Sequence, residues 1–176
     1  MQEPFKTVFQ VLSYLLTYPD DMWYKGLHDC LEAKKYMPEQ ICEKMEHFID
    51  AIRKMDENER IQSYVDTFDF GKKTNLYVTY HNLGEQRERG FELIALKQAY
   101  QKAGFEPTER ELPDYLPLML EFASLAEEHQ VASIFGKYLQ NIRDIQQRLI
   151  EAESIYQEIL HALLLVLREI GIGRKG

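Results

Sequence analysis

Residues 4–16 read PFKTVFQVLSYLL, and the apolar side chains of this stretch recur at steps of three and four residues. That spacing places Val8, Leu12 and Leu15 on one face of a helix, where they can pack against a core. The same periodicity returns along most of the chain and predicts roughly eight helices. Because no run of residues reads as a convincing strand, we predict an all-α fold, a single irregular helical bundle.

Three of the predicted helices carry the unusual residues of the chain. Residues 76–81, LYVTYH, combine β-favouring side chains with helical spacing, and we predict a short helix because no second strand lies nearby to pair with them. A long helix is predicted over 85–103, with Gly104 as its C-cap. The next is predicted over 113–128, with Asp114 in the first turn at the positive end of the helix dipole.

The chain length of 176 residues favours one domain. We assign residues 1–170 to a single helical domain and residues 171–176, GIGRKG, to a flexible C-terminal tail. The formal net charge is −8. An acidic chain argues against nucleic acid as the main partner and suits a basic partner such as a peptide rich in lysine and arginine.

The cysteines and the apolar segments indicate the cellular compartment of the protein. Cys30 and Cys42 fit no zinc or redox spacing and form no disulfide framework, which favours the reducing cytoplasm. The N-terminus lacks the basic and apolar regions of a signal peptide. The most apolar stretch, 159–167, is interrupted and is shorter than the roughly 20 residues of a membrane span. We therefore expect a cytoplasmic protein without direct membrane insertion.

No complete catalytic or metal-binding pattern occurs in the sequence. Residues 69–71, DFG, match the magnesium-binding tripeptide of protein kinases, but the other kinase motifs are missing. Glu158 and His161 form one Glu-x-x-His, whereas di-iron bundles need two such motifs. No glycine-rich phosphate loop precedes a helix. The sequence therefore predicts no enzyme, no catalytic residues, no metal and no cofactor.

The stretch 84–90, GEQRERG, is unusual for the start of a helix. Arg87 and Arg89 fall in the first turns, where the helix dipole disfavours cations, so they are expected to pair with carboxylates elsewhere. Gly90 costs about 1 kcal/mol relative to alanine within a helix. Close approach of another helix would explain it. These features can also be packing devices of the fold.

The stretch 111–122, ELPDYLPLMLEF, places two carboxylates about two helical turns apart. Asp114 and Glu121 lie among apolar side chains, and such an arrangement can line a groove for a basic, partly apolar peptide. Both carboxylates can also form internal salt bridges, for example to Arg87 and Arg89, and these need not exclude a binding role.

Taken together, these motifs resemble those of the NarJ subfamily of TorD-like redox-enzyme maturation chaperones. This subfamily comprises the delta subunits, or molybdenum cofactor assembly chaperones, of respiratory nitrate reductases. The matching pieces are, in chain order, 68–69, 76–81, 84–90, 112–117 and 120–122. Length, acidity and predicted helical content agree along nearly the whole chain.

The resemblance implies a TorD-like, non-catalytic cytosolic chaperone. Members of this family bind the N-terminal segment of the apo catalytic (alpha) subunit of nitrate reductase. They hold it until iron–sulfur and molybdenum cofactors are inserted and it docks on its membrane partner. Many members have histidine after the motif aspartate, where this sequence has Tyr115, so no role that needs an imidazole there carries over.

We therefore expect a basic, amphipathic N-terminal peptide of the catalytic subunit to lie in an apolar groove near the predicted helix 113–128. Candidate residues are Leu116, Leu120 and Phe122 for apolar contacts, Asp114 and Glu121 for cations, Tyr80, His81, Arg87 and Arg89 for the adjoining wall, and Tyr115 and Pro117 beside them. Two other interpretations stay open: an assembly factor that handles nucleotide or metal, and a purely structural helical adaptor.

Overall fold

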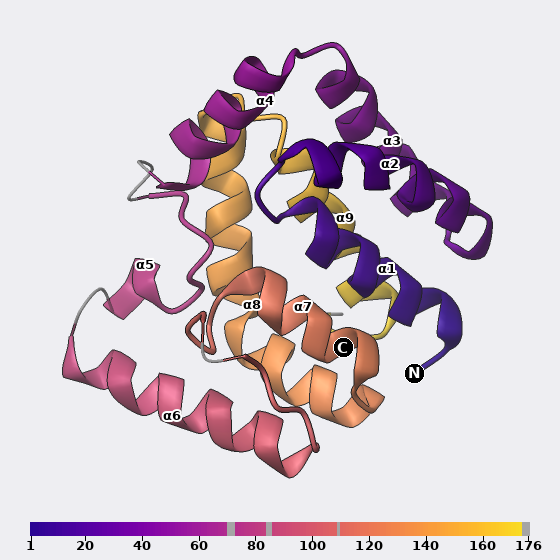
Figure 1. Ribbon diagram of the computed structural model, residues 1–176. Coiled ribbons are helices and arrows are strands. Elements are labelled where there is room, and N and C mark those ends of the chain that lie inside the picture. The colour runs from indigo at the N-terminus through magenta and orange to yellow at the C-terminus, as the bar shows by residue number, and fades with distance from the viewer. Residues whose placement is uncertain (70–72, 84–85, 109, 174–176) are drawn as a thin grey trace.

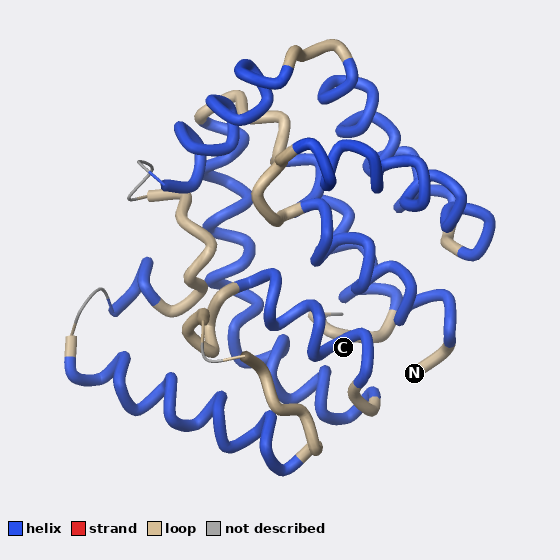
Figure 2. Tube along the Cα trace, in the orientation of Figure 1, coloured by secondary structure: helices blue, strands red, loops and turns tan. Residues whose placement is uncertain are grey.

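Helices make up the regular structure of the residues that the computed structural model describes, which are 1–69, 73–83, 86–108 and 110–173. Figures 1 and 2 show a bundle of helices that cross at varied angles, without a strand in the described part of the chain. The all-α prediction is confirmed. The α-helices are α1 (Glu3–Leu15), α2 (Asp21–Ala33), α3 (Glu39–Arg53), α4 (Glu57–Tyr64), α5 (Tyr80–Leu83), α6 (Arg87–Lys102), α7 (Leu116–Leu125), α8 (Glu128–Glu151) and α9 (Gln157–Glu169).

The apolar stripe of α1 lies at the centre of the bundle, as its periodicity predicted. α1 contacts α7, α9 and α2, while α3 and α8 both pack against α9 (Figure 1). Val8, Leu12 and Leu15 are buried in this core. Ser13 Oγ also donates a hydrogen bond to the carbonyl oxygen of Pro117 at 2.7 Å, which ties α1 to α7.

Local sequence explains where several helices begin and end. Asp20 caps α2, because its side chain accepts a hydrogen bond from the backbone N–H of Trp23 at 2.8 Å. Asp56 and Glu59 form a capping box at the start of α4. Ala103 is the C-cap of α6, and Gly104 follows it with φ of +74°, in the left-handed region that favours glycine, so the prediction that Gly104 ends this helix is confirmed.

The prediction of a short helix over 76–81 is wrong for residues 76–79. Only α5, at its end, is helical, and Tyr77 forms an isolated antiparallel bridge with Tyr115. Next to this bridge the backbone N–H of Leu116 donates to the carbonyl oxygen of Leu76 at 2.8 Å. The pairing partner comes from a distant part of the chain, so no neighbouring strand signals it.

The helix predicted over 113–128 begins later than expected. α7 starts at Leu116, with Tyr115 as its N-cap and Pro117 in its first turn. Asp114 therefore precedes the helix instead of lying in its first turn. The reason is that the bridge holds the backbone extended up to Tyr115, with the carbonyl oxygen of Asp114 accepting a hydrogen bond from the backbone N–H of Val78 at 2.9 Å.

In the segment 171–176, predicted to be a flexible tail, Ile172 is packed against the fold, while Gly171 and Gly173 are exposed. Ile172 is 8% exposed, and its backbone N–H donates to the carbonyl oxygen of Leu167 at 2.8 Å. Residues 174–176 lie outside the described residues. Among the helices described, none combines the length and apolar composition that crossing a membrane requires.

Two helical glycines are expected to respond in opposite ways to a methyl group. A Cβ at Gly26 would collide with the ring of Tyr14, which is fixed by a 3.0 Å hydrogen bond from its hydroxyl to the carbonyl oxygen of Trp23. A Cβ at Gly90 would meet nothing within 4 Å, so the described residues do not provide the close helix approach expected there.

Gly26→Ala should therefore lower the free energy of unfolding by about 1–3 kcal/mol through overpacking. Gly90→Ala should raise it by up to about 1 kcal/mol through helix propensity. Urea denaturation followed by circular dichroism measures both. Equal effects of the two substitutions would contradict this account of the Tyr14 contact.

Candidate functional site

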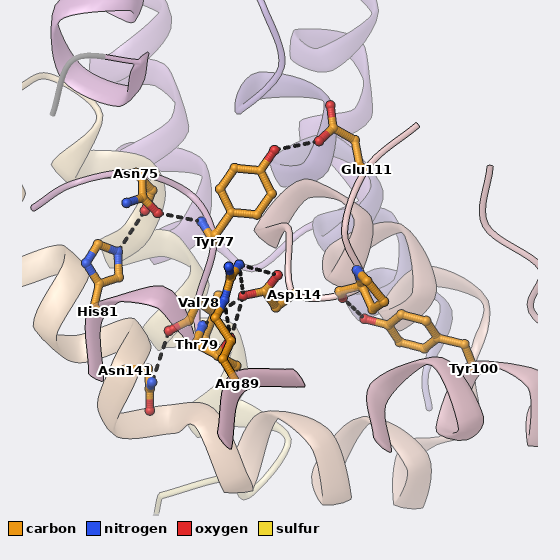
Figure 3. Close-up of polar contacts among 11 residues, drawn as sticks. Asn75, Tyr77, Val78, Thr79, His81, Arg89, Tyr100, Glu111, Asp114 and Asn141 are labelled. Carbon is orange, nitrogen blue, oxygen red and sulfur yellow. Dashed lines mark hydrogen bonds and ion pairs between the residues drawn. The ribbon is translucent and has the colours of Figure 1, made fainter. Parts of the chain in front are cut away.

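The unusual stretches of the sequence meet in one place. Figure 3 shows the segment 75–81, the start of α6 and the residues just before α7 gathered beside α8. Asp114 lies in the middle of this group, and Arg89 points toward it from α6. Residues that are far apart in the chain thus form one polar network.

Asp114 is the centre of the network and is fully buried. Its Oδ2 accepts hydrogen bonds from the backbone N–H and the hydroxyl of Thr79, at 3.1 and 2.7 Å. Arg89 Nη2 lies 3.1 Å from Oδ2 and 3.2 Å from Oδ1, and the Arg89 side chain is 12% exposed. A buried carboxylate of this kind needs a charged, hydrogen-bonded partner, and Arg89 supplies it.

Neighbouring helices hold the segments that carry this ion pair. Tyr100 of α6 donates its hydroxyl proton to the carbonyl oxygen of Pro113 at 2.7 Å. Asn141 of α8 donates from Nδ2 to the carbonyl oxygen of Val78 at 3.0 Å. The backbone N–H of Val78 in turn donates to the carbonyl oxygen of Asp114 at 2.9 Å. The irregular backbone on both sides of the bridge is therefore hydrogen-bonded to helices.

His81 is held as a neutral imidazole. Its Nδ1 lies 2.7 Å from Arg148 Nη1, which can only donate, so Nδ1 accepts and the proton lies on Nε2. That Nε2–H donates to the carbonyl oxygen of Asn75 at 2.9 Å. Burial lowers the pKa of His81, and the positive charge of Arg148 acts in the same direction, against the opposing effect of the Asn75 carbonyl.

An open cleft of about 410 Å³, which we call the Tyr80 cleft, lies beside the network. Its lining residues are Phe68, Asp69, Asn75, Tyr77, Tyr80, Arg89 and Leu112. This volume falls in the lower part of the range of about 300–1,000 Å³ found for ligand pockets. The guanidinium carbon of Arg89 lies 5.4 Å from the ring centre of Tyr80, so the ion pair also orders one wall of the cleft.

A π-helical turn, η2 (Val65–Asp69), continues α4 and brings two residues to the cleft. Phe68 is 5% exposed and packs on the buried ring of Tyr156, with ring centres 4.7 Å apart. Asp69 is exposed. Such irregular turns occur frequently at functional sites.

Carboxylates give the Tyr80 cleft its charge. Glu111 accepts a hydrogen bond from the Tyr77 hydroxyl at 2.7 Å at the edge of the cleft. Among the described residues, neither Asp69 nor Glu111 takes part in an ion pair. The described residues also contain no group of three or more His, Cys, Asp or Glu side chains arranged to hold a metal ion.

The structure divides the predicted site residues into three groups. Tyr80 and Arg89 line the Tyr80 cleft, and His81 lies next to it. The side chains of Asp114, Leu116, Pro117, Leu120 and Phe122 are buried, and Tyr115 is half-buried with its ring centre 5.3 Å from that of Tyr77. Glu121 and Arg87 are exposed and do not line this cleft.

One of the two motif carboxylates forms the internal salt bridge that the sequence suggested. Asp114 forms the internal salt bridge with Arg89, whereas Arg87 lies over the ring of Phe91 at 5.8 Å. Direct contact of a peptide with the buried side chains stays a prediction, and it would require the wall of the cleft to open. Tyr77 and Leu112 were not among the candidates, although both belong to the stretches singled out.

Comparison with known proteins identifies the family. The family model described as "Nitrate reductase delta subunit" matches residues 34–156, a span that contains the whole Tyr80 cleft. The chain belongs to the nitrate reductase delta subunit family. The resemblance indicated by the sequence motifs is thereby confirmed.

Three relatives each match most of the chain. It is 52% identical to the probable nitrate reductase molybdenum cofactor assembly chaperone NarJ of Bacillus subtilis, over 93% of this chain and 90% of that protein. It is 33% identical to the nitrate reductase molybdenum cofactor assembly chaperone NarJ of Escherichia coli K12, over 88% of this chain and 66% of that protein. The nitrate reductase-like protein NarX of Mycobacterium tuberculosis is 30% identical over 89% of this chain, which corresponds to 24% of NarX.

Removing the charge of Asp114 should destabilise this family member strongly. Asp114→Asn leaves Arg89 as an uncompensated, largely buried cation, which should lower the free energy of unfolding by about 3–5 kcal/mol. Lys6→Met breaks the exposed pair between Glu3 and Lys6 instead, and its effect should stay below about 1 kcal/mol. Chemical denaturation measures both; a loss for Asp114→Asn no larger than that of the control would refute the structural role.

The neutral state of His81 predicts a pH dependence of stability. Because its pKa is lowered in the folded protein, the unfolded chain binds the proton first as the pH falls through about 6.5. The stabilisation is therefore complete above that value and is lost below it. His81→Gln can keep both hydrogen bonds without titrating, so its melting temperature should fall less than that of the wild type between pH 7.5 and 5.5.

The control for this measurement is His129→Gln, because His129 is exposed at the start of α8. This variant should lose as much stability between the two pH values as the wild type. If His81→Gln lost just as much, the neutral imidazole would not be a source of the pH dependence.

Proposed function

We propose that the protein is a maturation chaperone of respiratory nitrate reductase. It binds the N-terminal segment of the apo catalytic subunit, holds it while molybdenum cofactor is inserted, and releases it before the enzyme docks at the membrane. The names of the relatives in Bacillus subtilis and Escherichia coli support the maturation role and agree with the prediction of a chaperone that is no enzyme. We place this activity in the cytoplasm, without nucleic acid as a partner.

The observation that carries the peptide-binding part of this proposal is the chemistry of the Tyr80 cleft. Tyr77, Tyr80 and Leu112 offer apolar surface that is open to a ligand. Asp69 and Glu111 add carboxylates without ion pairs in the described part of the chain. A basic, amphipathic segment can bury its apolar face against the rings and place its cations on these carboxylates.

The predicted site residues then have two kinds of role. Tyr80, His81 and Arg89 belong to the wall that the peptide meets. Asp114 holds Arg89 in place, and Leu116, Leu120, Pro117, Phe122 and the half-buried Tyr115 support that wall from the core. Glu121 lies outside the cleft, and its contact with a cation of the peptide stays a prediction.

Calorimetric titration with a 15-residue peptide from the N-terminus of the cognate catalytic subunit tests the proposal. We expect saturable binding with a micromolar or lower Kd and a negative heat-capacity change, because apolar surface is buried. Tyr80→Ala should raise the Kd at least about tenfold, which corresponds to about 1.4 kcal/mol.

The matched control is Tyr36→Ala, since Tyr36 is 59% exposed and does not line the cleft. This variant should bind like the wild type. Absence of binding by the folded wild-type protein would refute peptide capture and would favour the structural-adaptor interpretation. Saturable binding of nucleotide or metal instead would favour an assembly factor that handles them.

A further inference from the structure

A second hollow adjoins the Tyr80 cleft, and the Tyr80 side chain lines both. This hollow, which we call the Arg148 hollow, has a volume of about 350 Å³. Its lining residues are Lys73, Tyr80, His81, Arg148 and Glu151. The two spaces therefore share one tyrosine, and an extended or helical ligand that passes over Tyr80 would enter both.

The Tyr80 cleft is the acidic end of this surface. Asp69 is exposed, and Glu111 accepts only the Tyr77 hydroxyl among the bonds of the described residues. Arg89 is the cation of this end, but its charge is offset by Asp114, with Nη2 and Oδ2 3.1 Å apart. The unbalanced charge of the Tyr80 cleft is therefore negative.

The Arg148 hollow is the basic end. Lys73 and Arg148 are both cationic, and Glu151 is the carboxylate among its lining residues. His81 adds no charge, because it accepts a hydrogen bond from Arg148 at 2.7 Å. Arg148 also donates to the carbonyl oxygen of Lys73 at 3.2 Å, so its guanidinium is held in the wall of the hollow. The unbalanced charge of this end is positive.

We propose that the two hollows form one peptide groove whose ends carry opposite charge, and that this polarity sets the direction in which the peptide binds. The inference rests on the peptide capture proposed above and adds a requirement to it. The bound segment carries cationic side chains at the end over Asp69 and an acidic side chain at the end over Lys73 and Arg148.

The helix dipole gives the same direction if the segment binds as a helix. Its N-terminus, with a partial positive charge, is favoured over the carboxylates of the Tyr80 cleft, and its C-terminus over the cations of the Arg148 hollow. The N-terminal half of the peptide therefore lies in the Tyr80 cleft. A peptide in the opposite direction would place both its dipole and its cations against like charge.

Photo-crosslinking tests the direction of binding. Two versions of the 15-residue cognate peptide carry a benzophenone side chain, one near the N-terminus and one near the C-terminus. Mass spectrometry should find the N-terminal probe attached to 110–115 or 65–69 and the C-terminal probe attached to 148–151. The opposite pattern, or the same pattern for both probes, overturns the inference.

Charge reversal in the groove provides an independent measurement. Asp69→Lys and Lys73→Glu should each raise the Kd about fivefold, the size of one surface ion pair. Replacing the cations of the peptide by glutamine should abolish the effect of Asp69→Lys and leave that of Lys73→Glu intact. Replacing its acidic residue should do the reverse.

Matched controls are Asp50→Lys and Lys54→Glu, which reverse exposed charges at the end of α3, away from both hollows. These variants should leave the Kd unchanged. If the cognate peptide binds but all four variants behave alike, the polarity of the groove is refuted and the proposed function stands. If the peptide does not bind to the wild type, the proposed function and the inference both fail.

Discussion

The buried ion pair between Asp114 and Arg89 is the constraint on which the rest of the site depends. A carboxylate without exposed surface is tolerated only when its partners are fixed, and here Thr79 and Arg89 supply them from separate segments. The pair therefore joins the loop before α5, the start of α6 and the residue before the bridge at Tyr115. Each segment contributes to a wall of the Tyr80 cleft, so one electrostatic requirement positions the whole surface.

The residues that hold the fold together differ from the residues that line the Tyr80 cleft, although both kinds lie in the unusual stretches of the sequence. Asp114 and Leu116 stand within one short motif, yet both are buried and hold the fold together. The lining of the Tyr80 cleft includes tyrosines on the other side of the bridge, Tyr77 and Tyr80. A motif aspartate can thus mark a family through architecture, while neighbouring aromatic residues make the contacts that we propose.

Sequence reasoning succeeded where the determinants were local. The apolar stripe of α1 and the end of α6 at Gly104 each depend on residues within a turn or two, and the structure has both. The bridge between Tyr77 and Tyr115 was missed because its partner lies far along the chain.

The sequence predicted that the motif carboxylates can form internal salt bridges, but it did not predict which residues pair. Salt bridges to Arg87 and Arg89 were one alternative for the motif carboxylates, and only the fold shows that Asp114 pairs with Arg89. It also shows that Glu121 lies outside the Tyr80 cleft. Helical periodicity places a side chain on a face, but it does not reveal which other segment covers that face.

The long reach of the site's hydrogen bonds has a consequence for how the protein folds. Arg89 lies 25 residues from its partner Asp114 in the chain. Asn141 lies 63 residues from Val78, and Arg148 lies 67 residues from His81. Contacts of such separation form late, because the entropy of closing long loops must be overcome before they stabilise anything. The helices are local and are expected to form first, so the proposed groove is expected to be completed late. A newly made chain is therefore expected to acquire its proposed binding surface towards the end of its own folding.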